Sequence, residues 1–252
     1  MKRIDTFKSH LKEKKAIKVI AGIDNFNLEN IKKVVSAADQ AKASAVDISY
    51  GKGIFDLVSQ ITDLPIFVSS IVPEELSEAV EYGADAIEIG NYDVLYRKGT
   101  KISAERVLNI VNETLSLLNG REIFISVTVP GHIEVSEQIA LANELEALGI
   151  DLIQTEGAAT VTAQSAGARG LLETAQVSIS NTIELTRNTS IPIMCASGIT
   201  TTTAPMAFAA GASAIGIGSC VNKLDSVIAM IAVIRTLIEQ TEYKHESDLL
   251  NV

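Results

Sequence analysis

Four short segments of the sequence are variants of one pattern, in which a helix C-cap position precedes a short strand of alternating apolar residues. They are KASAVDIS (42–49), GADAIEIG (83–90), GIDLIQTE (149–156) and GASAIGIG (211–218). Glycine at the cap of three of them supplies the left-handed backbone conformation that ends a helix. Recurrence of such a unit predicts a fold that is assembled from repeated strand and helix pairs.

A second series of strands lies between these four units: IKVIAG (17–22), IFVSS (66–70), IFISVTV (123–129) and IPIMCASG (191–198). The helical segments expected between the eight strands include 28–40, 73–82, 103–118, 134–148, 171–188, 203–210 and 225–240. Pro73 and Ser103 are typical helix start signals. Strands that alternate with helices predict parallel pairing with right-handed crossovers. We therefore expect a closed (β/α)8 TIM barrel of the α/β class.

The amphipathic segment 3–15 is left over from this pattern, and we expect it to form an extra N-terminal helix that covers the bottom of the barrel. The chain has 252 residues and no Pro/Ser-rich linker, which predicts a single barrel domain over residues 1–252. A homo-oligomer is possible.

Charge and composition exclude several classes of partner. A formal net charge of −10 argues against nucleic acid, which needs a clustered basic face. The most apolar regions are too short or too interrupted to span a membrane, and the N-terminus lacks the apolar region of a secretory signal. We expect a soluble protein of the cytoplasm or the stroma. The two cysteines have no metal-ligand spacing, so no metal is expected.

Strand alternation places charged residues in the lumen of the predicted barrel. Aliphatic residues such as Val46 and Ile48 should face the helices, so Asp47 faces inward. By the same rule the inward positions include Lys18, Asp47, Glu88 and Glu156. Unpaired buried charge is costly. Two explanations are open: a compensated cluster of Lys18, Asp47 and Glu88 that is purely structural, or acid/base groups that lie beneath a substrate. A Schiff-base lysine is a further alternative for Lys18.

The loops after the seventh and eighth predicted strands are rich in glycine. They read ASGIT (196–200) and GSCVN (218–222). In barrels, these two loops and a short extra helix recurrently bind phosphate through backbone N–H groups. The predicted phosphate-binding residues are Ser197, Gly198, Gly218, Ser219 and Cys220. The alternative is that the glycines serve only tight turns, and the Cys220 side chain is expected to pack rather than react.

Several stretches also resemble known families. IPIMCASGI followed by AFAAGASAIGIGS resembles the general phosphate-binding barrel signature, which implies phosphate contacts at Ser197, Gly198, Gly218 and Ser219. KVIAGIDNFN, SSIVPEEL, GADAIEIGNYD, LIQTEG, CASGI with TAPMA, and GSCVNKL resemble the conserved chloroplast open-reading-frame family numbered twenty-three, found in cyanobacteria and algal plastids. This second resemblance covers nearly the whole chain. It implies a barrel fold but no established activity, so it assigns no catalytic residue.

Two other loops and one histidine are candidates at the same end of the barrel. GAATVTAQSAGARG (157–170), which contains Arg169, is interpreted as a lid or as a surface loop. NYDVLYRKG (91–99) could clamp a ligand or remain solvated. His132 is a possible proton carrier.

These features predict an enzyme that acts on a small phosphorylated metabolite by acid/base chemistry of the lyase, isomerase or synthase type. A non-catalytic ligand-binding or regulatory protein is the alternative. An FMN-binding oxidoreductase is also possible, because a flavin phosphate would fit the same loops.

Overall fold

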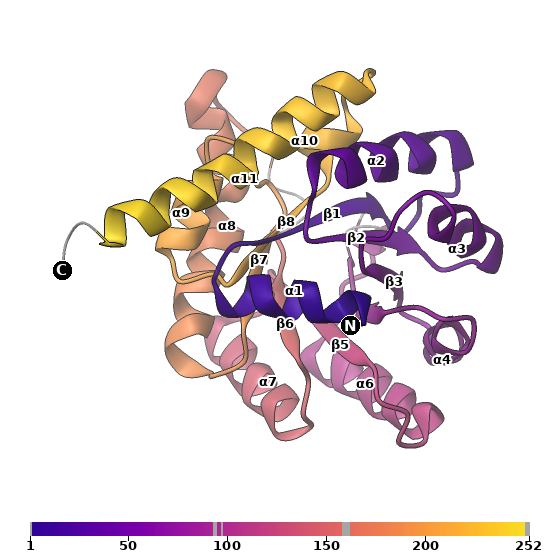
Figure 1. The fold of residues 1–252 in the computed structure, drawn as a ribbon. Coiled ribbons are helices and arrows are strands. Elements are labelled where there is room, and N and C mark those ends of the chain that lie inside the picture. Colours follow the sequence, from indigo (N-terminus) through magenta and orange to yellow (C-terminus); the bar gives the residue numbers. More distant parts are fainter. Residues whose placement is uncertain (1, 93–94, 97, 158–161, 250–252) are drawn as a thin grey trace.

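The computed structural model describes residues 2–92, 95–96, 98–157 and 162–249, without the side chains of 242–249. Its eight parallel strands form a closed barrel in chain order, with the last strand paired to the first (Figure 1). The strands are β1 (Ala16–Gly22), β2 (Ala45–Ser49), β3 (Ile66–Ser70), β4 (Ala86–Ile89), β5 (Phe124–Val129), β6 (Leu152–Thr155), β7 (Ile193–Ala196) and β8 (Ala214–Ile217). The predicted (β/α)8 barrel is confirmed.

The helices are α1 (Arg3–Lys12), α2 (Leu28–Ala41), α3 (Lys52–Ser59), α4 (Pro73–Glu81), α6 (Ala104–Leu118), α7 (Val135–Ala147), α8 (Gly167–Asn188), α9 (Ala204–Ala209), α10 (Ser219–Asn222) and α11 (Val227–Leu249). Pro73 occupies the first turn of α4, and the Ser103 side chain caps α6 by accepting from the Arg106 N–H at 3.2 Å. Sequence reasoning missed α3, a short helix without a side-chain cap. No helix of the described residues has the length and apolar character needed to cross a bilayer.

The four repeated units end their preceding helices as the sequence pattern predicts. Gly83, Gly149 and Gly211 have φ angles of +104°, +78° and +101°. Lys42, the one cap without glycine, adopts the same left-handed region at φ +63°. The fold therefore requires a left-handed backbone conformation at each of these caps. Glycine adopts this conformation at the lowest steric cost.

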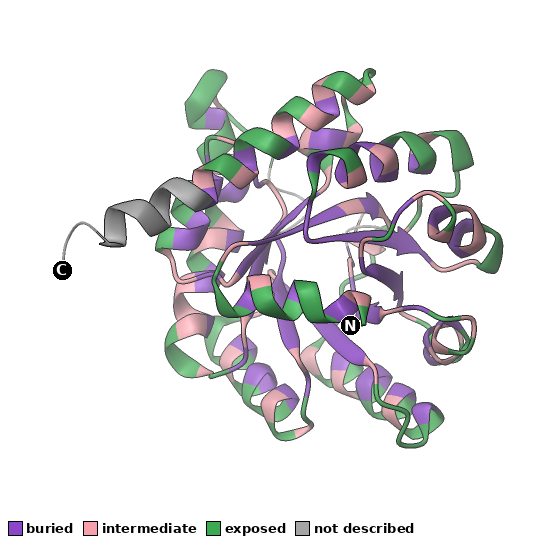
Figure 2. Ribbon diagram, in the orientation of Figure 1, coloured by how far each residue is buried: buried purple, intermediate pink, exposed green. Residues whose placement is uncertain are grey.

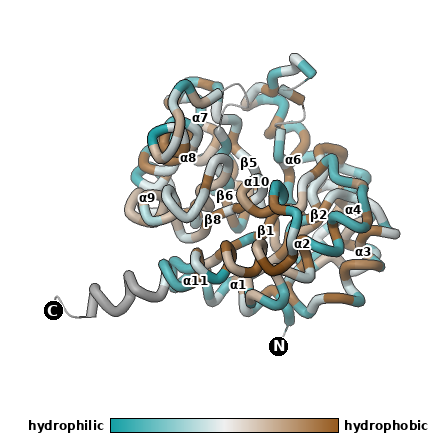
Figure 3. The backbone as a smooth tube through the Cα atoms, turned by 90° about the horizontal axis from the view of Figure 1, so that it is seen from above, coloured by the Kyte–Doolittle hydropathy of each residue, from teal (hydrophilic) through white to brown (hydrophobic). Residues whose placement is uncertain are grey.

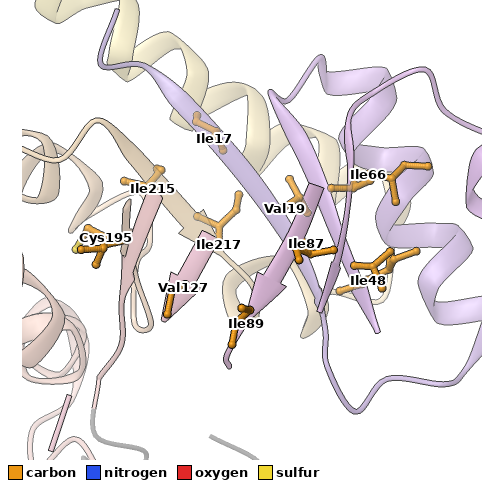
Figure 4. Close-up of a cluster of buried hydrophobic side chains, with 14 of the residues drawn as sticks. Ile17, Val19, Ile48, Ile66, Ile87, Ile89, Val127, Cys195, Ile215 and Ile217 are labelled. Atoms are coloured by element: carbon orange, nitrogen blue, oxygen red, sulfur yellow. The ribbon is translucent and has the colours of Figure 1, made fainter. Parts of the chain in front are cut away.

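An aliphatic layer joins the barrel to the helices. Figure 4 labels Ile17, Val19, Ile48, Ile66, Ile87, Ile89, Val127, Cys195, Ile215 and Ile217, all of them buried. Figure 2 shows the strands buried and the outer faces of the helices exposed. Figure 3 shows hydrophobic and hydrophilic residues alternating along the helices, as expected for helices with one buried and one exposed face. Because this side of each strand is used for packing, the alternate residues must point into the barrel.

A second apolar layer closes the bottom of the barrel. In Figure 1, α1 crosses the barrel opening. Phe7 of α1 is fully buried, and its ring lies 5.0 Å from the Phe67 ring and 5.7 Å from the Phe124 ring in edge-to-face contact. The layer comprises Ile4, Phe7, Leu11, Ala16, Ala45, Phe67, Ala86, Phe124, Leu152, Met194 and Ala214. The predicted N-terminal helix therefore covers the barrel bottom as expected.

Candidate functional site

An ion cluster occupies the middle of the lumen, one layer above the aromatic residues. Lys18 Nζ lies 2.9 Å from Asp47 Oδ2 and 2.8 Å from Glu88 Oε2. None of the three side chains has any solvent exposure. Strands β1, β2 and β4 therefore bring together the three residues that alternation placed inside the barrel, in the ion-paired arrangement of the first alternative.

The surroundings of the cluster shift two pKa values. Burial disfavours the Lys18 ammonium, but the adjacent Asp47 and Glu88 carboxylates outweigh burial and raise the pKa of Lys18. Burial raises the pKa of Asp47, although the ammonium opposes the shift. A Schiff-base lysine requires a free amine and hence a lowered pKa. The cluster therefore argues against that alternative for Lys18.

Two hydroxyl groups complete the coordination of the carboxylates. The Ser69 hydroxyl donates to Asp47 Oδ1, and the Thr128 hydroxyl donates to Glu88 Oε1 at 2.7 Å. Both donors are fully buried and come from the strands β3 and β5. Each carboxylate thus contacts the shared Lys18 ammonium and accepts a hydrogen bond from one hydroxyl. These contacts offset much of the cost of burying its charge.

Two amide side chains close this arrangement into a ring on the side of the barrel mouth. Asn91 Nδ2 donates to the Ser69 hydroxyl oxygen at 3.1 Å. Gln154 Nε2 donates to Asn91 Oδ1 at 2.9 Å and to the Thr128 hydroxyl oxygen at 3.1 Å. The hydrogen-bonded ring therefore links the buried ion cluster to residues at the carboxyl ends of the strands. Sequence reasoning did not single out Ser69, Thr128 or Asn91.

Gly90 makes this ring possible. A Cβ atom at position 90 would lie 2.2 Å from Thr128 Oγ1, and the residue has a φ of +154°. A side chain at this position would displace Thr128 from Glu88. Gly90, the last residue of the second repeated unit, is therefore required by close approach as well as by conformation.

The predicted phosphate loops line one cavity of about 150 Å³ at the carboxyl ends of β7 and β8. Four of the five predicted phosphate-binding residues border it: Ser197, Gly198, Gly218 and Ser219. Gln154, Asn91 and Glu156 border the same cavity. Gln154 is buried, and its Oε1 atom accepts no hydrogen bond from the described residues. We call this space the anion cavity.

The loop after β7 is held against α8. Ser197 and Gly198 have φ angles of +73° and +78°. The Ser178 hydroxyl donates to the Ser197 carbonyl oxygen at 3.0 Å, and a Cβ atom at position 198 would lie 2.7 Å from the Thr174 carbonyl oxygen. Gly198 therefore meets both a conformational and a packing requirement.

Gly216 within β8 and Gly218 directly after it meet different requirements. Gly218 has a φ of −124°, and a Cβ atom there would lie 3.4 Å from the Ile20 carbonyl oxygen, an ordinary contact. A Cβ atom at Gly216 would lie 2.8 Å from the Ala196 Cβ. Gly218 thus leaves space at the anion cavity without needing an unusual φ. The Cys220 side chain does not border the cavity but packs against the core, and burial raises its pKa to about 11.

Glu156 is the predicted acid/base residue that reaches the anion cavity. Its carboxylate is buried and accepts a hydrogen bond from the Tyr96 hydroxyl. The Tyr96 ring packs edge-to-face on His132, with ring centroids 5.0 Å apart. Burial lowers the pKa of His132, which favours its neutral form. Lys18, Asp47 and Glu88 lie deeper and do not border the cavity.

Arg169 lies on the first turn of α8 rather than in a loop, because that helix begins at Gly167. Its Nε atom is 3.2 Å from Glu173 Oε1, and its side chain is 81% exposed. Residues 158–161 of the proposed lid and Arg97 of the proposed clamp lie outside the described residues. The lid remains a prediction.

A closed ring of eight parallel strands, with its polar cavity at their carboxyl ends, defines a (β/α)8 barrel of the α/β class. The family model described as "Protein of unknown function (DUF561)" matches residues 2–247, and the chain belongs to this family.

The relatives of the chain include proteins that carry the name "Uncharacterized protein ycf23". The protein from Cyanophora paradoxa is 40% identical over 242 residues, which cover 96% of this chain and 97% of the relative. The protein from Antithamnion sp. is 38% identical over 241 residues, which cover 92% and 86%. The resemblance stated from the sequence motifs is confirmed.

Solved structures share the fold at low sequence identity. The 3-hexulose-6-phosphate synthase from Salmonella typhimurium has a TM-score of 0.64 at 10% identity, covering 90% of this chain and 99% of that one. (S)-3-O-geranylgeranylglyceryl phosphate synthase from Thermoplasma acidophilum, in complex with its substrate sn-glycerol-1-phosphate, has a TM-score of 0.59 at 14% identity, covering 93% and 97%. At these identities the likeness establishes the barrel alone.

Proposed function

We propose that the protein binds the phosphate group of a small phosphorylated metabolite in the anion cavity and acts on that metabolite by acid/base chemistry. One observation carries the proposal: residues of the β7 and β8 loops line the same small cavity as Glu156. The names of the synthases with the same fold refer to phosphorylated compounds, which supports the proposal. Barrels recurrently bind phosphate at these two loops.

The arrangement assigns different roles to the predicted residues. Backbone N–H groups of the two loops and the hydroxyls of Ser197 and Ser219 hold the phosphate. Glu156, at the same cavity, exchanges a proton with the ligand near its phosphate end. The Tyr96 hydroxyl donates to this carboxylate and orients it. A lyase, isomerase or synthase reaction is consistent with one carboxylate in this position.

The cluster of Lys18, Asp47 and Glu88 positions the site from below. Its side chains have no solvent exposure, so they do not touch a ligand in the anion cavity. They act through Asn91 and Gln154, whose amides the hydrogen-bonded ring fixes in place. In this proposal the three residues are positioning residues, and Glu156 is the catalytic candidate.

Three of the four acid/base candidates, Lys18, Asp47 and Glu88, have no solvent exposure and do not border the anion cavity. Their position favours one alternative, a protein that binds the phosphorylated ligand without transforming it. FMN also stays a candidate, because its phosphate would occupy the same two loops. A purified protein that is yellow would indicate the flavin. Turnover lost in Glu156→Gln with ligand binding retained would separate the enzyme from the binding protein.

The anion cavity is tested by two substitutions in one loop. Ser219→Ala removes one hydroxyl and should weaken phosphate binding by about 1 kcal/mol. Gly218→Val fills space beside the cavity and should prevent at least two backbone hydrogen bonds, which corresponds to a loss of about thirtyfold in affinity. Isothermal titration with inorganic phosphate measures both effects.

Stability measurements provide the control for Gly218→Val. The Cβ atom at this position meets only ordinary contacts, so Gly218→Ala should fold like the parent protein and give an intermediate affinity. Equal phosphate affinity in the parent and in Gly218→Val would contradict the proposal. So would crystals grown in phosphate or sulfate in which the anion occupies another part of the barrel mouth.

A further inference from the structure

A second, larger cavity opens beside the anion cavity, at the carboxyl ends of β1 to β4. Its volume is about 420 Å³. Six apolar or aromatic side chains contribute to its lining: Ile23, Phe26, Tyr50, Ile71, Val72 and Leu95. We call this space the apolar cavity. None of the side chains assigned above to catalysis or phosphate binding lines it.

Asn91 lies between the two cavities, because it is a lining residue of both. The anion cavity, at about 150 Å³, is smaller than a typical small-molecule site of about 300–1,000 Å³. A ligand whose phosphate lies on the β7 and β8 loops must therefore extend beyond that cavity. The apolar cavity falls within the typical range and shares the lining residue Asn91 with the anion cavity.

The rim of the apolar cavity exposes large hydrophobic side chains to solvent. Phe26 is 66% exposed and Val72 is 40% exposed. Exposed apolar side chains that are scattered singly need no explanation, but here two of them border one cavity with further apolar residues. Covering these side chains with the carbon body of a ligand would remove apolar area from water and so strengthen binding.

The charges around the apolar cavity disfavour a second phosphate. Asp24 and Glu75 border it and Lys98 is the one cation among its described lining residues. Glu75 accepts a hydrogen bond from the Ser70 hydroxyl. Two carboxylates beside one ammonium would repel a dianion. The end of the ligand that enters this cavity should therefore carry no second phosphate.

We infer that the ligand is a phosphate monoester with an extended apolar body, which places its phosphate in the anion cavity and its body in the apolar cavity over β1 to β4. This inference rests on the proposed function, since the anion cavity fixes one end of the ligand. It adds the class of substrate: monophosphates with a hydrophobic carbon skeleton rather than bisphosphates or compact sugar phosphates.

Binding of inorganic phosphate and of methyl, butyl and hexyl phosphate tests the inference. Titration calorimetry should show tighter binding with each methylene that enters the apolar cavity, by up to about fourfold per group, the equivalent of about 0.8 kcal/mol. Hexanediol bisphosphate, with a phosphate at each end, should bind more weakly than hexyl phosphate. Crystals soaked in hexyl phosphate should place the chain beside Phe26.

A surface variant separates the apolar cavity from general hydrophobic adsorption. In Phe26→Ser the ratio of the hexyl phosphate affinity to the inorganic phosphate affinity should fall towards one. The matched control is Ile228→Ser, which alters a residue that is 79% exposed at the start of α11, outside both cavities. This control should keep the parent ratio.

The possible outcomes distinguish the inference from the function on which it rests. In one outcome, inorganic phosphate binds on the β7 and β8 loops while methyl, butyl and hexyl phosphate bind with the same affinity as one another. This result would overturn the apolar site and leave the anion site standing. Tighter binding of the bisphosphate would also overturn it. Failure of every phosphate to bind would overturn the proposed function, and the inference with it.

Discussion

Replacement of Lys18 by methionine is expected to lower the free energy of unfolding by roughly 3–5 kcal/mol. Lys18 Nζ contacts both Asp47 and Glu88 at less than 3 Å, and none of the three side chains reaches solvent. Methionine has a similar length but leaves two carboxylates buried without a cation. Urea denaturation of the parent and the variant measures the difference.

The deficit of Lys18→Met should depend on pH. Without the ammonium, burial raises the folded-state pKa of Asp47 further above its value in the unfolded chain. A group with a raised folded pKa stabilises the fold below its unfolded pKa and loses this contribution as the pH rises through its folded pKa. The deficit should therefore be smaller at about pH 5 than at about pH 8.

A charge-neutral variant supplies the control. Lys18→Met combined with Asp47→Asn and Glu88→Gln removes the whole charge cluster, and replacing a buried ion group as a unit is often neutral. This triple variant should recover most of the stability and lose the pH dependence. A single Lys18→Met variant with the stability of the parent at both pH values would show that the ion cluster is not needed for folding.

The charged layer of the lumen could be predicted from the sequence because the side to which a residue points depends on one property, the two-residue period of a strand. Lys18, Asp47 and Glu88 lie on three different strands, and once the aliphatic residues are assigned outward no other side remains for them. The period does not give the depth of a residue along the barrel. For that reason the sequence could not separate Glu156, which borders the anion cavity, from the three residues below it.

The hydrogen-bonded ring could not be predicted in the same way. Ser69 and Thr128 alternate like their neighbours, but the choice of partner depends on how the strands are staggered. Asn91 reaches both cavities because it leaves β4 with a left-handed φ of +66°, which the sequence does not reveal. The loop glycines were found by their position after the strands, whereas the different constraints on Gly198 and Gly218 require the coordinates.

Phe7→Ala should be as costly as the loss of Lys18, at about 3–5 kcal/mol for a large aromatic residue in a core. Phe7 fills the barrel bottom between Phe67 and Phe124, and the Lys18 Nζ atom lies 4.8 Å above the centre of the Phe67 ring. A cavity at position 7 would thus loosen the aromatic layer that keeps water from the ion cluster.

Phe26→Ala is the matched control for this substitution, because it removes the same side chain from a site that is 66% exposed. It should change the free energy of unfolding by less than about 0.5 kcal/mol. Equal stabilities of the two variants would mean that α1 rests on the barrel without sealing it. A loss confined to Phe7→Ala would instead make the N-terminal helix part of the support for the site, since the aromatic layer that it completes lies directly beneath Lys18.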